Sequence, residues 1–230
     1  MSYALVMPTA RERARAGLTS DIKDIARRHL AVDGAAGLSL RAVARELGMV
    51  SSAVYRYFPS RDELLTALIV DAYDAVGAAA ETAEAQVRRA DVVGRWLAAA
   101  RAVRTWAVAQ PQEWALLFGS PVPGYAAPTD TVAPATRIPL LLLGIVADGT
   151  REGADLPPLP RAVRIGLEGV AAQTVDLPAP LMARAVMAWT HLVGCISFEL
   201  FGHLVGSVED YPAWFDVQVR ALGASVGVAR

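Results

Sequence analysis

Apolar residues recur at helical spacing along almost the whole chain, and this periodicity restricts the fold more than any other feature of the sequence. Steps of three and four residues place side chains on one face of an α-helix, whereas a half-buried strand needs strict alternation. The 230 residues contain no alternation of strand length and no internal repeat. The chain is therefore predicted to be all-α, with a small N-terminal three-helix domain followed by a larger helical domain.

Three short helices are predicted near the N-terminus, because caps and breakers bracket three amphipathic segments. The first is capped at residues 19–20 and ends near Gly34. The second is capped by Ser39 and ends before Gly48, and the third follows directly over about residues 50–57. Such closely joined helices indicate a compact unit with little room for loops.

A longer helix is predicted over residues 61–85, where Ser60 and Glu63 form a capping box, and it connects the small domain to the remainder. Residues 120–134 hold four prolines without a regular period, so they are predicted to be a loop over the second domain. Further helices are expected over residues 91–109, 111–119, 134–152, 160–175, 180–205 and 210–222. The predicted domains are a basic arm over residues 1–17, a small domain over 18–65 and a large domain over 66–230.

The charge is divided unevenly along the chain. Residues 1–61 hold 10 Lys and Arg against 5 Asp and Glu, whereas the remainder holds 12 against 18, although the whole chain has a net charge of −1. A local excess of positive charge attracts polyanions such as nucleic acids. Only the N-terminal part is therefore expected to bind one, and Arg11, Arg13 and Arg15 are expected to follow the DNA backbone or enter its minor groove.

The second and third predicted helices, joined at Gly48, have the arrangement of a helix-turn-helix, whose second helix enters the major groove of DNA. Val50 and Val54 are expected to be buried. Short polar side chains at the start of the third helix let the backbone approach base edges, and nearby tyrosines and arginines can bind phosphates. The residues expected to bind DNA are Ser39, Arg41, Ser51, Ser52, Ala53, Tyr55, Arg56, Tyr57 and Arg61.

The segment from Leu38 to Leu65, LSLRAVARELGMVSSAVYRYFPSRDELL, resembles the DNA-binding segment of the TetR family of bacterial regulators. The likeness includes Gly48 in the turn and YRYFPS at residues 55–60, and it extends over about residues 19–73. Arg61 stands where the family more often has lysine, and it keeps the positive charge. The resemblance implies a homodimeric repressor that binds palindromic operator DNA and is released by a small apolar effector, without a cofactor. A DNA-binding activator or architectural factor without a ligand would have a similar sequence.

Residues 188–204, AWTHLVGCISFELFGHL, resemble the C-terminal domain of a TetR subgroup with a Trp/His/Gly signature, which implies an effector-binding and dimerisation domain. Ordinary core packing is the alternative for its apolar residues. The residues expected to line an effector pocket are Trp96, Trp106, Trp114, Phe118, Tyr125, Met187, Trp189 and His191. The residues expected in a dimer interface between the last two helices and their symmetry mates are Leu181, Ala185, Ala188, Leu192, Cys195, Phe198, Trp214 and Phe215.

Two further patterns resemble sites but are not expected to be sites. His191, Cys195, Glu199 and His203 recur every four residues, but helix geometry separates the outer pair by about 18 Å, so no metal site is expected. The G-x-S-x-G pattern at residues 223–227 lies too close to the end of the chain for a hydrolase nucleophile elbow, which needs a strand before it and a histidine after it. The chain is therefore not expected to be an enzyme.

The chain is expected to be cytoplasmic. The apolar segments at residues 138–147 and 181–204 are too short or too interrupted by charge to span a membrane, and residues 1–9 lack the apolar region of a signal peptide. The single cysteine fits a reducing compartment. A mean hydropathy of +0.34 is high for such a chain and indicates apolar surface for a ligand or a partner.

Overall fold

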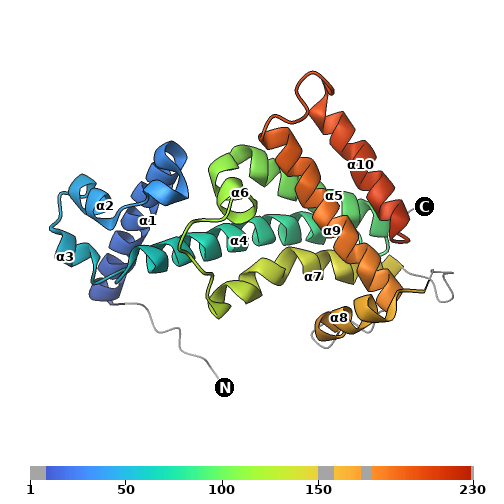
Figure 1. Cartoon of the computed structure of the whole chain (residues 1–230), viewed down its shortest axis with the longest axis horizontal. Helices are drawn as coiled ribbons and strands as arrows, with labels where there is room; N and C mark the ends of the chain where they lie inside the picture. The colour runs from blue at the N-terminus through green and yellow to red at the C-terminus, as the bar shows by residue number, and fades with distance from the viewer. Residues whose placement is uncertain (1–8, 150–157, 172–177, 229–230) are drawn as a thin grey trace. The chain divides into compact units, whose positions relative to one another are not determined.

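The computed structural model describes residues 9–149, 158–171 and 178–228, which fold into helices joined by turns and short loops (Figure 1). No β-strand occurs in these ranges, and the all-α prediction is confirmed. The α-helices are α1 (Ala10–Gly37), α2 (Leu40–Glu46), α3 (Ser51–Val54), α4 (Arg61–Ala85), α5 (Val92–Ala109), α6 (Pro111–Phe118), α7 (Val132–Gly149), α8 (Arg161–Ala171), α9 (Ala179–Leu200) and α10 (Tyr211–Ser225), and a short 3₁₀ helix covers Thr129–Thr131.

The chain forms two compact units. The first contains α1, α2, α3 and α4 up to Ile69, together with the loop Ser120–Pro128, and the second contains the rest of α4 and α5 to α10. The loop is predicted to lie over the second domain, but it belongs to the first unit, where the hydroxyls of Tyr125 and Thr66 share a hydrogen bond of 2.9 Å. Helix α4 is continuous and contributes to both units.

Helix α1 begins at Ala10, well before its predicted cap. The hydroxyl of Thr9 accepts a hydrogen bond from the N–H of Glu12, and the Glu12 carboxylate accepts one from the N–H of Thr9, which completes a capping box. The Ala, Arg and Glu residues that follow favour a helix. Thr19 lies inside this helix and donates to the carbonyl of Arg15. The segment predicted to be a basic arm is therefore helical from Ala10 onward.

Helices α2 and α3 are joined by a tight turn. Ser39 caps α2 by accepting a hydrogen bond from the N–H of Ala42. Gly48 has a φ of 65°, in the left-handed region that glycine adopts at little cost, and the chain turns there toward α3. The third helix is shorter than predicted, since residues 55–57 form turns. Val50 is predicted to be buried but is 72% exposed, because it precedes α3 as its N-cap residue.

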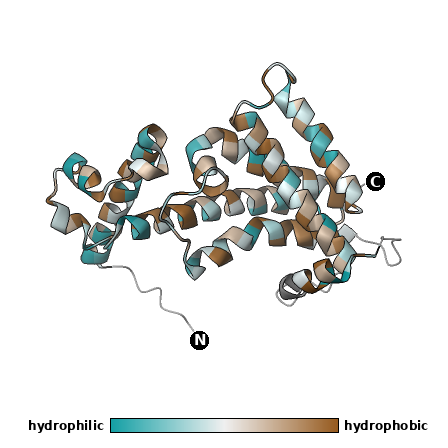
Figure 2. Cartoon of the chain, viewed as in Figure 1, coloured by the Kyte–Doolittle hydropathy of each residue, from teal (hydrophilic) through white to brown (hydrophobic). Residues whose placement is uncertain are grey.

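Each unit has its own apolar core. In the second unit a cluster of buried residues comes from α4, α5, α6, α7, α9 and α10, and hydrophobic residues recur along these helices (Figure 2). The Trp96 indole lies inside this cluster, where its N–H donates to the carbonyl of Val219 at 2.9 Å. The buried apolar residues of the first unit include Ile22, Ile25, Leu30, Val43, Val54, Phe58, Leu64, Leu65 and Leu68.

Two segments are long and apolar enough to cross a membrane by length and composition alone, namely Thr129–Gly149 and Ala179–Leu200. Core helices of globular proteins satisfy the same criterion. Both segments contribute to the core of the second unit, for example through Ile145 and Ile196, which are fully buried. Packing in that core therefore accounts for part of their apolar character.

Arg137 of α7 lies across α4 and binds carboxylates on both sides. Its guanidinium pairs with Glu81 through two hydrogen bonds, of 2.9 and 2.6 Å, and with the Asp74 carboxylate at 2.8 Å. Gly77 lies between these two acidic residues, and a Cβ placed there would come within 2.9 Å of Arg137 Nε. The small residue lets the arginine cross close to the helix, so the side chain fixes α4 against α7.

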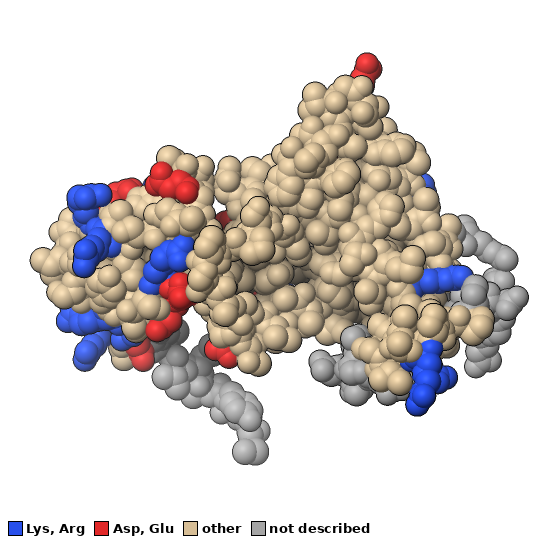
Figure 3. Space-filling model, viewed as in Figure 1, with Lys and Arg blue, Asp and Glu red and all other residues tan. Residues whose placement is uncertain are grey.

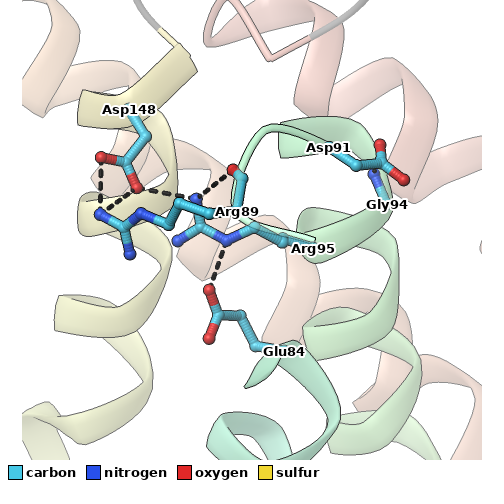
Figure 4. A network of polar contacts seen from close by, with 6 residues as sticks. All are labelled: Glu84, Arg89, Asp91, Gly94, Arg95 and Asp148. Atoms are coloured by element: carbon cyan, nitrogen blue, oxygen red, sulfur yellow. Dashed lines mark hydrogen bonds and ion pairs between the residues drawn. The ribbon is translucent and has the colours of Figure 1, made fainter. Parts of the chain in front are cut away.

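A second polar network lies at the C-terminal end of α4 (Figure 4). Arg95 of α5 is almost fully buried and binds Glu84 of α4 and, at 2.7 Å, Asp148 of α7. Arg89 also binds Asp148, and its backbone carbonyl accepts a hydrogen bond from Arg95. A buried arginine needs such partners to offset its desolvation. The network therefore joins three helices of the second unit.

Candidate functional site

The candidate DNA-binding surface lies on the helix-turn-helix of the first unit. Ser52, Tyr55 and Arg56 are exposed at α3 and the turn after it, and Arg41 is exposed on α2. Many of the lysine and arginine side chains visible in Figure 3 lie over this unit. The exposed groups combine hydrogen-bond donors for base edges with cations for phosphates, which is the chemistry that a major groove requires.

Two predicted DNA-binding residues occupy other positions. Ala53 is buried on the inner face of α3 beside Val54. Its side chain therefore contributes to packing and does not face DNA, contrary to the prediction. Arg61 donates to the carbonyl of Ala35 at 2.6 Å and to that of Ala36 at 3.4 Å, at the end of α1. The guanidinium therefore adds hydrogen bonds to the carbonyls at the end of α1, where Ala35 also accepts one from the N–H of Leu38, and this is a structural role.

Tyr57 is half-buried, and the guanidinium of Arg15 lies over its ring at 5.5 Å from the centroid. This cation–π contact joins the first turns of α1 to the end of the recognition segment. Ser39 and Ser51 are partly exposed, the former as the cap of α2. The contact between Arg15 and Tyr57 was not predicted, since residues so far apart in sequence give no periodic signal.

An exposed polar cluster joins α1 to α2. Glu46 accepts hydrogen bonds from Arg28 at 2.7 Å and shares one of 2.8 Å with His29. The hydrogen bond from Arg28 lowers the pKa of the Glu46 carboxyl, and His29 contributes in the same direction. The cluster holds α1 to α2, the helix that precedes the turn, so it supports the geometry of the helix-turn-helix.

Part of the predicted effector pocket forms an aromatic cluster in the second unit. Phe118 of α6 packs against Trp114 with a ring separation of 4.4 Å and lies edge-on to Tyr73 and Trp189 at 6.0 Å each. Trp114 is fully buried and donates to the Ser197 hydroxyl, whereas the other three rings are half-buried. Burial raises the pKa of the Tyr73 hydroxyl. The cluster offers an apolar, partly accessible surface built from α4, α6 and α9.

The other predicted pocket residues lie elsewhere. Trp96 fills the space between α5 and α10, where Gly223 packs against its ring. Tyr125 belongs to the first unit, and Met187 is 67% exposed. Trp106 packs at the edge of the core. The eight residues predicted as one pocket therefore do not form a single site, because apolar residues at helical spacing serve several different packing faces.

Most of the residues predicted for the dimer interface are buried within their own chain. Helix α9 packs against α5, α6, α7, α8 and α10 of the same chain, so its most regular apolar stripe faces inward. Only Phe198 and Trp214 of the predicted set are exposed, the former by 55%. The six residues that lie instead in the chain's own core are Leu181, Ala185, Ala188, Leu192, Cys195 and Phe215.

Several large apolar residues of α9 and α10 are exposed. Phe198 and Phe201 lie near the end of α9, and Trp214 and Val217 lie on α10. An open groove of about 310 Å³ is formed by residues of α9 and α10 together with Leu204, and Phe198 is the one of these four that lines it. The groove is lined by His191, Gly194, Cys195, Phe198, Leu204 and Gln218. His191 therefore lies in this groove rather than with the aromatic cluster.

Residues of the two patterns that resemble a metal site and a nucleophile elbow have hydrogen-bond partners within the chain. Glu199 binds Arg104 through two hydrogen bonds, of 2.8 and 2.6 Å, and the Cys195 thiol donates to Gln218. Ser225 closes α10, where its hydroxyl donates to the carbonyl of Leu222. A serine in the last turn of a helix lacks the strand-to-helix geometry of a nucleophile elbow.

A basic unit with a helix-turn-helix, followed by a separate helical unit, defines a helix-turn-helix regulator of transcription. The family model described as bacterial regulatory proteins, tetR family, matches residues 22–68, and the model described as tetracyclin repressor-like, C-terminal domain, matches residues 96–222. The chain belongs to the TetR family of transcriptional regulators, as the resemblance predicted. The matching families are regulators of transcription, which confirms that the chain is not an enzyme.

The relatives cover nearly the whole chain. The HTH-type transcriptional regulators Mb1846 of Mycobacterium bovis and Rv1816 of Mycobacterium tuberculosis are each 44% identical over 227 residues, which cover 93% of this chain and 94% of the relative. The crystal structure of a regulatory protein designated SCO4313 has a TM-score of 0.78 and 35% identity, covering 93% of this chain and 98% of that one. A protein of unknown function from Rhodococcus sp. RHA1 shares the fold, with a TM-score of 0.63 and 24% identity over 99% of this chain and 97% of its own.

Proposed function

We propose that this regulator is a cytoplasmic repressor that binds a palindromic operator as a homodimer and releases it when a small apolar effector binds the second unit. The observation that carries the proposal is that α4 begins directly after the helix-turn-helix and continues as a core helix of the second unit. A ligand that changes the position of α4 in the second unit therefore acts on a helix that the first, DNA-binding unit also contains.

The exposed apolar face of α9 and α10 supports a homodimer. Phe198, Phe201, Trp214 and Val217 are large apolar residues exposed to water at or near the ends of α9 and on α10, and a second copy packed there would remove this apolar surface from water. A two-fold axis would bring the same face from each copy together and give an isologous interface. Two reading helices related by such an axis match two half-sites of an inverted repeat, one helical turn of DNA or a multiple apart.

The aromatic cluster supports an apolar effector. Tyr73, Phe118 and Trp189 each keep part of their ring surface accessible, and Tyr73 lies on α4 itself. An apolar molecule bound there would bury that surface and contact the connecting helix. The effector releases DNA only to the extent that it prefers the DNA-incompetent arrangement, so operator must weaken effector binding by the same factor.

The function is tested by selecting bound duplexes from a random 30-base-pair library and adding an apolar solvent extract of cells. We expect the selected sequences to contain an inverted repeat and the extract to reduce binding of the selected duplex. A single unrepeated site would contradict the dimeric reading of DNA, and a duplex that stays bound in every extract fraction would contradict induction.

Tyr55 provides the site-specific variant for this experiment. Replacing Tyr55 by alanine should weaken binding of the selected duplex several-fold to about thirtyfold, because one polar contact contributes roughly 1–2 kcal/mol. Fluorescence anisotropy measures the affinity, and far-UV circular dichroism should remain unchanged because the ring is exposed. Tyr55→Phe is the matched control that removes the hydroxyl alone. Unchanged affinity in Tyr55→Ala would remove this residue from the DNA interface.

A further inference from the structure

The first turns of α1 extend beyond the DNA-binding segment that the family model recognises. That model begins at residue 22, whereas α1 begins at Ala10, so the helical segment Ala10–Asp21 precedes the match. At 1.5 Å per residue this extension is about 18 Å long. The segment Ala10–Asp21 is therefore not part of the helix-turn-helix that the family model matches.

The helical conformation gives the arginines of the extension fixed directions. The capping box of Thr9 and Glu12 holds the first turn, and the helix then continues without a break past Arg15. Arg11 and Arg15 are four residues apart and share one face, because residues four apart lie one above the other. Arg13 is turned away from both by about 200° at 100° per residue.

The face of Arg11 and Arg15 is adjacent to the recognition segment. The guanidinium carbon of Arg15 lies 5.5 Å from the centroid of the Tyr57 ring, just after α3. A cation–π contact uses the flat face of the guanidinium and leaves its N–H groups at the edge available for other partners. Arg15 is exposed, so these donors can reach a phosphate.

These arginines also keep their charge without a neighbouring carboxylate. In the described part of the chain no ion pair joins Arg11 or Arg15 to an acidic residue, whereas Arg27 and Arg28 pair with Asp24 and Glu46. Glu12 lies next to Arg11 in sequence, but its carboxylate accepts the hydrogen bond from Thr9 at 2.7 Å. The face is therefore a positive surface beside the helices that read DNA.

We propose that Arg11 and Arg15 bind phosphates of duplex DNA beside the sequence read by α3, as a second anchor that does not depend on base sequence. The proposal rests on DNA binding by the first unit. Since duplex DNA rises 3.4 Å per base pair, an 18 Å extension follows at most about five base pairs. Phosphate contacts add affinity and salt dependence without adding specificity.

The test uses the full chain and a fluorescein-labelled 30-base-pair duplex of arbitrary sequence, with Kd measured between 50 and 200 mM NaCl. Two lost phosphate contacts reduce the slope of log K against log salt by about two units. Wild type should therefore lose about tenfold more affinity than Arg11→Ala/Arg15→Ala over this range. Arg11→Lys/Arg15→Lys should restore the slope, which separates charge from any change in folding.

Arg13→Ala is the matched control, because it removes one charge from the same helix on the opposite side, and it should keep the wild-type slope. Equal slopes for wild type and the double alanine variant would overturn the proposal while leaving DNA binding intact. A slope reduced equally by Arg13→Ala would also overturn it, since the effect would then be net charge alone. If wild type binds neither this duplex nor a selected operator, DNA binding and the second anchor both fail.

Discussion

The Cys195 thiol donates a hydrogen bond of 2.9 Å to Oε1 of Gln218 and so joins α9 to α10. Burial raises the pKa of this thiol to about 11. Because only the thiolate is an effective nucleophile, roughly one molecule in a thousand is reactive at pH 8. The residue is therefore a packing element whose side chain is protonated under ordinary conditions.

This protonation state predicts slow labelling of Cys195. In the folded protein at pH 8, a disulfide reagent such as 5,5′-dithiobis(2-nitrobenzoate) should react on the order of a hundredfold more slowly than in denaturant, where the thiol has its usual pKa of about 8.5. Absorbance of the released thiolate measures the rate. Labelling at the denatured rate would contradict both the burial and the raised pKa.

At the scale of single helices, the crossing of α4 by Arg137 depends on the charge of Glu81. The hydrogen bond from Arg137 lowers the pKa of the Glu81 carboxyl below its ordinary value of 4.5. A carboxylate with a lowered folded-state pKa stabilises the fold above its unfolded pKa, and this contribution is lost as pH falls through the folded-state value. The contribution at neutral pH is about 0.5–1 kcal/mol, since the side chain is partly exposed.

We therefore expect Glu81→Gln to lower the free energy of unfolding at pH 7 by about this amount. The difference from wild type should stay constant down to about pH 4.5 and shrink at lower pH, where wild type also loses the charge. Urea denaturation at several pH values measures it. Glu209→Gln is a suitable control, because that residue is exposed and the carboxylates that pair with Arg137 are those of Asp74 and Glu81. A difference that grows toward low pH would contradict the assignment.

The bounds of the helices could be predicted from sequence more completely than which side of each helix is buried. The bounds of α5, α6 and α10 follow from prolines, caps and periodic apolar residues, which act locally. The buried side of α9 could not be predicted in the same way, because Leu192 and Phe198 are both apolar but lie in different environments. When a helix is apolar on several sides, no single apolar stripe shows which side packs in the core and which side binds a partner. The start of α1 at Ala10 was not predicted, although Thr9 and Glu12 have the spacing of a capping box.

The DNA-binding segment was predictable because its turn, caps and exposed polar residues are close in sequence. The roles of Arg61 and Ala53 were not, since one depends on where the carbonyls of α1 end and the other on the packing of α3. The aromatic cluster was predicted only in part: Trp114, Phe118 and Trp189 were named, but Tyr73 was not. Contacts between distant segments require the tertiary fold and carry no local signal.

At the scale of the whole molecule, the proposed dimer is tested on the exposed face of α10. Val217 is 58% exposed there, and Val108 of α5 is 46% exposed on a helix outside that face. Val217→Arg should place a charge from each copy in the interface and raise the dimer Kd about a hundredfold, from roughly 3 kcal/mol of uncompensated charge burial. Analytical ultracentrifugation should show a folded monomer with weakened operator binding. Val108→Arg should remain dimeric, and a dimeric Val217→Arg variant would exclude this face.

The boundary between the two units lies inside α4, between Ile69 and Val70, rather than in a loop. Domains joined by a flexible linker tolerate insertions and exchange of parts between relatives. Here the boundary falls inside a helix, where each backbone hydrogen bond joins residues four positions apart. A hybrid that exchanges the first unit between relatives must therefore keep these hydrogen bonds across its junction.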